Sequence, residues 1–510
     1  MKKITLLMAA MTASVMSFAA LNPFAYGLSS ELNAGETNLT VKYALNDDAT
    51  TVKVVIMNGE TAVKTIDCKG ITKGEYTEVI PTEGLPKGVE LTWKVEVTGA
   101  EVTAVTEGKN YGLYHPSSVD IDVNPESENF GRIICNEGMN SVKTMTKGKY
   151  ISEGFGAGIF AFTPSFEQIK NGDKAGFNGG IEFANSRPGT TSTAYCPRRI
   201  RISEDGRIFV TSLNTDGTYL WELNPSNLDE WTPVFSGAKI NEQFELLDAD
   251  SNFIAGPNAG FDVRGAGEQL QLLMLSANPV GFNGVQSGYK CSEYNLGTAT
   301  EWKQTRSKVV FDSIYAVNYL GSQVQYDAEG GVWFISNRSA DFISEKQPGL
   351  VHFNRSGVED YKALRADTKN AGFRFNRDFT KVIVATNGKK GTIYNVSKDT
   401  EGKPVLTEEL VIDMKTVGNN LNDFAWDYAN NIYALGNSSE KIAVYSLPHA
   451  ADAVVATPAA KKYAFTLDGM GTYVDNTEVE TAVTEKVVRN GQVLIIRDGK
   501  TYNMMGQIVE

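Results

Sequence analysis

Charged and amide side chains recur at equivalent positions in six short segments of this sequence. In each segment they alternate with apolar residues, which is the pattern of a β-strand with one polar and one apolar face. Arginine forks, carboxylates and side-chain amides can together hold the hydroxyl groups of a polar ligand such as a glycan. The residues that we predict to bind such a ligand are Asp122, Arg199, Arg201, Asp262, Arg264, Gln323, Gln325, Arg374 and Asp423.

A second interpretation assigns the same side chains to structure. Arg201 would then pair with Asp262, and Arg374 with Asp423, as ion pairs between neighbouring segments. On the sequence alone we favour this pairing over an open site. The two interpretations differ in what a structure would show, because paired groups fill the space between strands, whereas a binding site leaves an open pocket.

Residues with the usual catalytic chemistry are scarce. The chain has three histidines, His115, His352 and His449, and none lies in a zinc-type cluster or beside a Gly-x-Ser-x-Gly elbow. A dinucleotide-binding glycine fingerprint and a phosphate-binding loop are also missing from the sequence. We therefore expect a non-catalytic protein more than an enzyme, although a tyrosine or carboxylate mechanism stays open.

Calcium is the one cofactor that the sequence leaves open. Asp248, Asp250 and Asn252 alternate as at the start of a calcium loop, but Phe253 stands where the loop needs glycine, and no glutamate closes it. We favour a solvated acidic turn at this place and expect no cofactor.

Each polar segment begins a larger repeat, in which a polar turn and a more continuous apolar segment follow. The copies lie about 50 to 60 residues apart, which is the period of a propeller blade with long loops. Because the first strand of each blade runs beside the central channel, the polar side chains would converge near its axis. The first strands are expected at 119–123, 199–202, 261–263, 324–326, 373–375 and 424–426.

Six copies predict a six-bladed β-propeller within an all-β protein. We expect residues 462–467 to close the ring, with a seventh blade there as the alternative. The region resembles secreted propellers of the NHL type and related bacterial surface proteins, most specifically from Asp122 to Arg132. Residues 451–460 are expected to be a linker.

A small β-sandwich is predicted ahead of the propeller. Alternation at 39–45, 52–56 and 91–97 indicates strands, and Asn58-Gly59 is a tight-turn signal. The strand end at 43–46, the strand at 49–54, the Asn58-Gly59 turn and the lead at 84–88 resemble the immunoglobulin-like module related to the flagellar hook-cap protein. That resemblance implies a spacer or adhesion unit.

Both ends of the chain indicate export. Lys2-Lys3, an apolar stretch at 4–16 and small residues at 17–19 have the layout of a secretory signal peptide. The last residues are expected to form a β-hairpin tail, and with Tyr502 to Gly506 they resemble the C-terminal sorting signal of secreted Bacteroidetes proteins. An ordinary terminal hairpin is the alternative. The cysteines of an exported protein could pair in three ways among Cys68, Cys135, Cys196 and Cys291.

The predicted order is a signal peptide at 1–19, an Ig-like sandwich at 22–106, a propeller at 112–470 and a sorting-type tail at 484–510. The formal charge of −13, without a basic block, argues against nucleic acid and anionic membranes as partners. No later segment approaches the roughly 20 apolar residues of a membrane span.

These features favour a periplasmic, cell-surface or extracellular protein that binds or scaffolds without catalysis. Its expected partners are a glycan, a surface polysaccharide or another envelope protein. The alternatives are a propeller polysaccharide lyase or glycoside hydrolase, and a purely structural envelope protein.

Overall fold

The computed structural model shows an all-β protein. Its helical turns within the described residues are three short 3-10 segments, η3 (Gly267–Gln269), η5 (Lys415–Val417) and η6 (Lys461–Tyr463), and no described helix is long and apolar enough to span a membrane. The structure describes residues 21–113, 116–137, 158–173, 176–177, 197–211, 219–242, 245–256, 258–276, 288–299, 308–316, 318–337, 349–363, 372–386, 389–418, 421–436, 441–468, 485–489, 492–497, 500–502 and 509.

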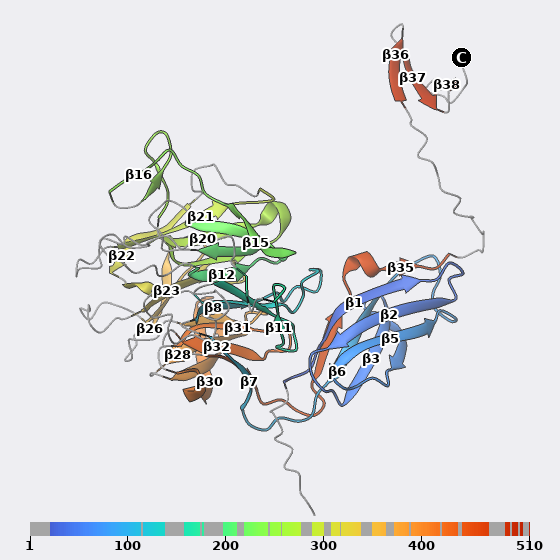
Figure 1. Ribbon diagram of the computed structural model, residues 1–510, viewed down its shortest axis with the longest axis horizontal. Helices are drawn as coiled ribbons and strands as arrows, with labels where there is room; N and C mark the ends of the chain where they lie inside the picture. Colours follow the sequence, from blue (N-terminus) through green and yellow to red (C-terminus); the bar gives the residue numbers. More distant parts are fainter. Residues whose placement is uncertain are drawn as a thin grey trace, which may run out of the picture.

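Six antiparallel sheets of four strands each form a β-propeller, the larger body in Figure 1. This confirms the all-β, six-bladed fold that the repeat predicts. Blade 1 holds β8 (Pro116–Ile121), β9 (Ile133–Glu137), β10 (Gly158–Phe162) and β11 (Gln168–Ile169); blade 2 holds β12 (Arg199–Ile202), β13 (Ile208–Thr211), β14 (Leu220–Asn224) and β15 (Asn227–Pro233); blade 3 holds β19 (Asn258–Arg264), β20 (Gln271–Ser276), β21 (Gly288–Asn295) and β22 (Lys308–Ala316); blade 4 holds β23 (Asn318–Tyr326), β24 (Val332–Asn337), β25 (Leu350–Phe353) and β26 (Glu359–Ala363); blade 5 holds β27 (Phe373–Phe375), β28 (Lys381–Thr386), β29 (Lys390–Lys398) and β30 (Pro404–Asp413); blade 6 holds β31 (Leu421–Trp426), β32 (Ile432–Gly436), β33 (Lys441–Ser446) and β7 (Thr106–Gly112).

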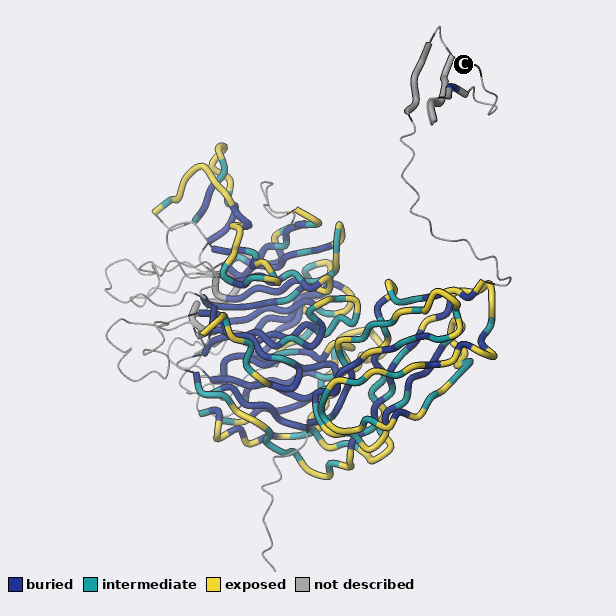
Figure 2. The backbone as a smooth tube through the Cα atoms, turned by 45° about the vertical axis from the view of Figure 1, so that its right-hand side comes forward, coloured by how far each residue is buried: buried dark blue, intermediate teal, exposed yellow. Residues whose placement is uncertain are grey.

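The second strand of each blade is apolar because its two faces pack against neighbouring blades. Ile134, Leu273 and Phe334 on three of these strands have no exposed surface, and the strands form the dark-blue interior of Figure 2. Polar turns join them to the first strands. In blade 4, Asp327 accepts the backbone N–H groups of Glu329 and Gly331 at 2.8 and 2.6 Å, which fixes the reversal.

The ring closes differently from the prediction. The outermost strand of blade 6 is β7, which precedes blade 1 in the chain and pairs antiparallel with β33. The predicted closing segment, 462–467, lies elsewhere, since its strand β35 (Phe465–Thr466) pairs with β6 (Glu90–Thr98) of the sandwich. The chain leaving the sandwich meets blade 6 first, so its own next strand fills the open edge and no seventh blade forms there.

The sandwich contains strands that precede the propeller in the sequence and also strands, β34 and β35, that follow it. Its sheets are β1-β2-β5 and β34-β6-β3-β4. The predicted linker is therefore wrong in part, because β34 (Val454–Pro458) pairs along the whole of its length with β6. Trp93 and Tyr43 lie in the sandwich core, where the predicted alternation places them. The remaining strands are β1 (Ala25–Leu32), β2 (Asn38–Leu45), β3 (Thr51–Asn58), β4 (Thr61–Asp67) and β5 (Gly74–Pro81).

The sandwich docks on the propeller face that carries the turns between first and second strands. Phe24 packs edge-on against Phe130 at 5.9 Å between ring centroids, and Tyr428 joins the same cluster. Beside it, the backbone N–H of Asn22 donates to the side chain of Asn431 at 2.9 Å, and that side chain donates back to the Asn22 carbonyl at 3.0 Å. The two modules thus share an apolar contact bordered by hydrogen bonds.

Asp427 holds the side chain of Asn431 in position for this contact. It accepts the side-chain amide of Asn431 at 2.7 Å and is buried in the turn after β31. Burial raises the pKa of Asp427 to about 7, although its hydrogen bonds from Asn431 and Ala429 act in the opposite direction.

The pKa of Asp427 predicts how stability changes with pH. A carboxyl whose pKa is higher in the folded than in the unfolded protein contributes most at low pH and loses that contribution as pH rises through the folded pKa. Between pH 4 and 7 the wild type should therefore lose stability relative to Asp427→Asn, by at most about 1.4 kcal/mol per pH unit. Urea unfolding of both proteins across this pH range tests the prediction. Equal dependence of stability on pH in the wild type and Asp427→Asn would refute it. As a control, the stability of Asp452→Asn, at an exposed position, should follow that of the wild type.

Two smaller sheets complete the described structure. One lies between blades 2 and 3, and the other is the expected three-stranded tail. Cys68, Cys135 and Cys291 are buried, and Cys196 lies outside the described residues, as does the predicted signal peptide. The strands are β16 (Lys239–Ile240), β17 (Leu246–Leu247), β18 (Phe253–Ala255), β36 (Glu485–Arg489), β37 (Gln492–Arg497) and β38 (Lys500–Tyr502).

Candidate functional site

The polar residues of the first strands form two rings around the propeller axis. The mouth ring lies nearer the face that carries the sandwich, and the inner ring lies two residues earlier in each strand. Alternation along a strand places both rings on the same face, toward the axis. The mouth ring is Asp120, Arg201, Asp262, Gln325, Arg374 and Ala425, and the inner ring is Ser118, Arg199, Gly260, Gln323, Gly372 and Asp423.

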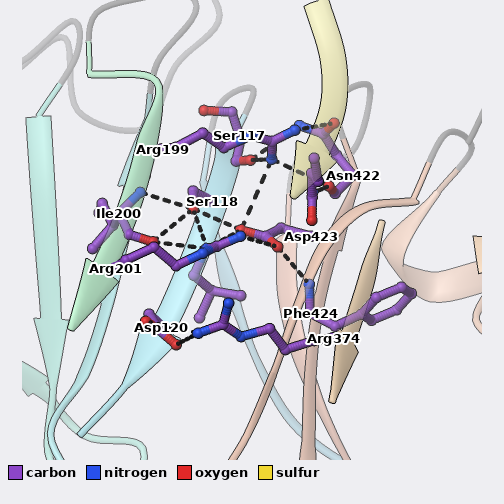
Figure 3. Close-up of polar contacts among 12 residues, drawn as sticks. Ser117, Ser118, Asp120, Arg199, Ile200, Arg201, Arg374, Asn422, Asp423 and Phe424 are labelled. Carbon is purple, nitrogen blue, oxygen red and sulfur yellow. Dashed lines mark hydrogen bonds and ion pairs between the residues drawn. The ribbon is translucent and has the colours of Figure 1, made fainter. Parts of the chain in front are cut away.

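Arg201 of blade 2 reaches across to Asp423 of blade 6. Its guanidinium donates to both carboxylate oxygens, at 3.0 and 3.3 Å, and Ser118 donates to the same carboxylate at 2.6 Å (Figure 3). Arg201 and Asp423 are both almost fully buried. This is a forked, charge-assisted interaction, the strong kind of hydrogen-bonded ion pair.

Arg374 of blade 5 makes a second bridge across the axis. It donates to Asp262 of blade 3 at 3.0 Å and to Asp120 of blade 1 at 3.3 Å. Three alternate blades therefore meet at one guanidinium. Of the two ion pairs predicted from sequence, Arg201 and Asp262 approach to 3.9 Å, while Arg374 contacts Asp262 and Asp120 in place of Asp423.

The inner ring closes the channel below these pairs. Arg199 donates to the carbonyl oxygens of Ser117 at 2.6 Å and Asn422 at 3.2 Å, and Gln323 donates to the Asn422 carbonyl as well. Of the two glycines of this ring, Gly260 permits close approach of the neighbouring strand, since a Cβ there would lie 2.7 Å from the Ser322 carbonyl oxygen. Arg199 and Gln323 are buried, so this layer is filled by protein.

The electrostatics of the rings reflect both the ion pairs and the burial of their members. Burial alone would raise the pKa of Asp423, but the charges of Arg201 and Arg199 outweigh it and hold that pKa below its ordinary value. Likewise, burial disfavours the charged form of Arg374, and Asp120 and Asp262 overcome this and raise its pKa. Burial raises the pKa of Asp120 despite Arg374.

The mouth ring also fastens neighbouring blades to one another. Asp120 accepts the backbone N–H of Ile202 at 2.8 Å, and Asp262 accepts that of Tyr326 at 2.9 Å. Gln325 accepts the N–H of Phe375 at 3.1 Å in the same way. Each bond joins one blade to the next, so these side chains have a structural role whatever else they do.

The structure therefore separates the predicted ligand residues into two groups. Arg199, Arg201, Gln323 and Asp423 lie in the buried network, and Asp122 lies in the turn after β8, where it accepts the Asn124 N–H at 3.1 Å. The remaining four, Asp262, Arg264, Gln325 and Arg374, line an open space among the described residues.

That space is the mouth cavity, of 470 Å³, above the mouth ring. Its floor is Asp120, Asp262 and Arg374, and its walls include turn residues of several blades. Pro458, at the end of β34, also lines it, so the sandwich contributes to the site. Sequence reasoning missed this contribution, as well as the roles of Ser118 and Asn422, because none of these belongs to the charged pattern.

Arg264 stands apart from the ion pairs. It donates to the side-chain oxygen of Gln271 at 2.7 Å and lies over the ring of Tyr326, 4.4 Å from its centroid. Arg264 is half-buried and lines the mouth cavity. Its charge therefore faces the cavity with support from a neutral amide and an aromatic face.

The histidines and the predicted calcium turn have other partners. His352 lies between Asp360 and Asp327, at 2.5 and 2.9 Å, and His449 contacts the Leu447 carbonyl at 3.0 Å. His115 lies outside the described residues. Asp248 accepts hydrogen bonds from the backbone of Asp250 and from both the backbone and the side chain of Asn252. Within the described part of the chain, no group of three or more potential metal ligands is gathered.

Comparisons with known proteins say little more. No protein-family model and no curated protein sequence matches the chain. Among solved structures, it is similar to a structural-genomics protein of unknown function from Bacteroides thetaiotaomicron, at 8% identity and a TM-score of 0.37, over 82% of this chain and 98% of that one. It is also similar to streptogramin B lyase, at 9% identity and a TM-score of 0.33, over 67% and 98%. At these TM-scores neither likeness carries an argument, and the fold rests on the strand pairing above.

Proposed function

We propose that this protein is an exported, non-catalytic binding protein that holds a neutral glycan in the mouth cavity. The observation that carries the proposal is the balance of charge around this cavity. A 470 Å³ space lies within the range of small-ligand pockets. Its charged lining residues are three carboxylates, Asp120, Glu204 and Asp262, and three guanidinium groups, Arg264, Arg374 and Arg377.

A balanced polar lining suits hydroxyl groups better than a charged ligand. Hydroxyls both donate and accept, so they can bond to carboxylates and guanidinium groups at once. Side-chain amides of Asn124, Gln325 and Asn376 also line the cavity, although each already makes hydrogen bonds within the protein. An anionic or cationic ligand would instead leave half of the charged lining with like-charge contacts.

The pairing of the carboxylates favours binding over catalysis. Glycoside hydrolysis by two carboxylates needs one as a proton donor and the other as a base or nucleophile. Here one guanidinium, Arg374, contacts both Asp120 and Asp262. Both carboxylates therefore accept hydrogen bonds from Arg374, which suits a fixed binding surface.

Export and surface display belong to the same proposal. They are supported by the signal-like sequence at 1–19 and the sorting-like tail after residue 484. The sandwich would then act as a spacer that also closes one side of the site. A surface polysaccharide is the partner that fits this placement.

Arg264 provides the most direct test of the proposed site, because it faces the cavity without taking part in the ion pairs. The chain from residue 21 onward is screened on a glycan array, and the best neutral ligand is then titrated calorimetrically. Arg264→Ala should weaken binding about tenfold, equivalent to about 1.4 kcal/mol. Arg355→Ala, on an exposed turn of blade 4 outside the cavity, should bind as the wild type does. A protein that binds no neutral glycan, or an Arg264→Ala variant with unchanged affinity, would refute the proposal.

A further inference from the structure

Two more cavities border the junction between the sandwich and the propeller. The blade-5 cavity, of 460 Å³, lies between residues of blades 5 and 6 and the segment that leads into β34, and it includes Lys381 and Glu409. The blade-1 cavity, of 610 Å³, lies between the turn at 125–130 and residues 26–29 of β1. Each is of a size that a small ligand could fill.

The mouth cavity adjoins both of them. Arg377 and Tyr428 line the mouth cavity and the blade-5 cavity together. Pro125 and Pro458 line the mouth cavity and the blade-1 cavity together. The mouth cavity therefore shares wall residues with both of the other cavities, and we name the three neighbouring spaces together the junction groove.

The residues that neighbouring cavities share are held in place. Tyr428 donates from its hydroxyl to the Ala456 carbonyl at 2.9 Å, and Arg377 lies over its ring at 3.8 Å from the centroid. Pro458 ends the strand β34, whose pairing with β6 fixes its position. A groove with such walls is preformed, so a ligand need not order it on binding.

Charge is balanced along the whole junction groove, as it is in the mouth cavity. The lining contains six carboxylates and six cationic side chains, in a chain whose overall charge is −13. A strongly acidic or basic polymer would meet as many like as opposite charges there. The carboxylates are Asp120, Glu126, Glu128, Glu204, Asp262 and Glu409, and the cations are Arg132, Arg264, Arg374, Arg377, Lys381 and Lys462.

We infer that the ligand is a linear neutral oligosaccharide several units long, which lies along the junction groove with one unit in the mouth cavity. The inference rests on the proposed function and adds the length of the ligand and the part played by the sandwich. Half-buried Tyr26 and Tyr463 line the blade-1 cavity, where aromatic rings can pack against sugar faces. Asn22 and Asn430 supply amides to the blade-5 cavity.

A length series tests this inference. Neutral gluco-, manno- and xylo-oligosaccharides of about two to eight units are titrated into the chain from residue 21 onward. Because each added unit reaches further along the groove, affinity should rise about tenfold or more from the disaccharide to the hexasaccharide and then level off.

Blocking variants show where the added units lie. Ser29→Trp fills the blade-1 cavity and should reduce the gain for long sugars while short ones bind as before. Ala453→Trp does the same in the blade-5 cavity and serves if the first variant fails to fold. Ser226→Trp, on an exposed turn of blade 2, is the matched control and should behave as the wild type.

The outcomes separate the two proposals. Equal affinity at every length would overturn the groove and leave the mouth cavity as the site. A length effect that neither blocking variant reduces would also overturn it. If no neutral sugar of any length binds, the proposed function fails together with the groove.

Discussion

Asp423→Ala should destabilise the protein by about 3–5 kcal/mol, the usual loss when one partner of a buried ion pair is removed. Asp423 has no exposed surface and accepts the forked interaction of Arg201. Arg199 also approaches it, to 3.8 Å. Without Asp423 both guanidinium groups would remain buried with less compensation, and urea unfolding would show the loss directly.

A double variant separates charge from packing. Arg201→Met with Asp423→Leu removes one positive and one negative charge, so the remaining rings stay neutral. Apolar replacement of a whole buried pair is often neutral or stabilising. The double variant should therefore regain the part of the lost stability that belongs to the Arg201 pair, while buried Arg199 still lacks its contact with Asp423. If Asp423→Ala alone costs less than about 1 kcal/mol, the pair is not the buried interaction described here.

Arg374→Met should be comparably harmful, and its effect should depend on pH. Arg374 is the direct ion-pair partner of Asp120 and is hydrogen-bonded to Asp262. Burial already raises the pKa of Asp120, and Arg374 lowers it, so that pKa should rise further without Arg374. A raised folded pKa means that stability is lost as pH rises. The loss relative to the wild type should be about 3 kcal/mol or more at pH 8 and smaller at pH 5.

Chemical unfolding at the two pH values provides the measurement, and exposed Arg355→Met is the control without an expected change. A loss of the same size at both pH values would mean that only packing was changed at Arg374. In that case the pKa of Asp120 would not depend on the charge of Arg374.

The arrangement of the blades could be predicted because it depends on local patterns. Alternation around Ile200, Phe261 and Phe424 places each first strand in a blade, and β12, β19 and β31 contain these residues. The same alternation correctly turns Arg201, Asp262 and Arg374 toward a common axis. Of the two predicted ion pairs, Arg201 with Asp262 is confirmed at 3.9 Å, and Arg374 with Asp423 is wrong.

The particular partners could not be read from the sequence. The predicted pairs join neighbouring blades, whereas the hydrogen bonds of Arg201 join blade 2 to blade 6 and those of Arg374 join blade 5 to blades 1 and 3. A narrow channel allows a long guanidinium to cross the axis, and channel width is set by close contacts such as that of Gly260 with Ser322. Such contacts leave no periodic signal.

The site itself depends on parts of the chain far apart in sequence. β34 follows the propeller but pairs with β6, which precedes it, and so brings Pro458 to the mouth cavity. In the sequence this segment looks like a linker rich in alanine. Its strand character comes from the open edge of β6, a tertiary influence that overrides local composition.

A structure of the protein with its best-binding neutral hexasaccharide tests the central claim most directly. We predict sugar density in the mouth cavity beside Arg264 and Arg374, continuing past Tyr428 or Pro458 into a flanking cavity, with the ion pairs beneath it unchanged. Sugar bound elsewhere on the protein, or sugar that enters the axis by breaking the contact of Arg201 with Asp423, would contradict the account.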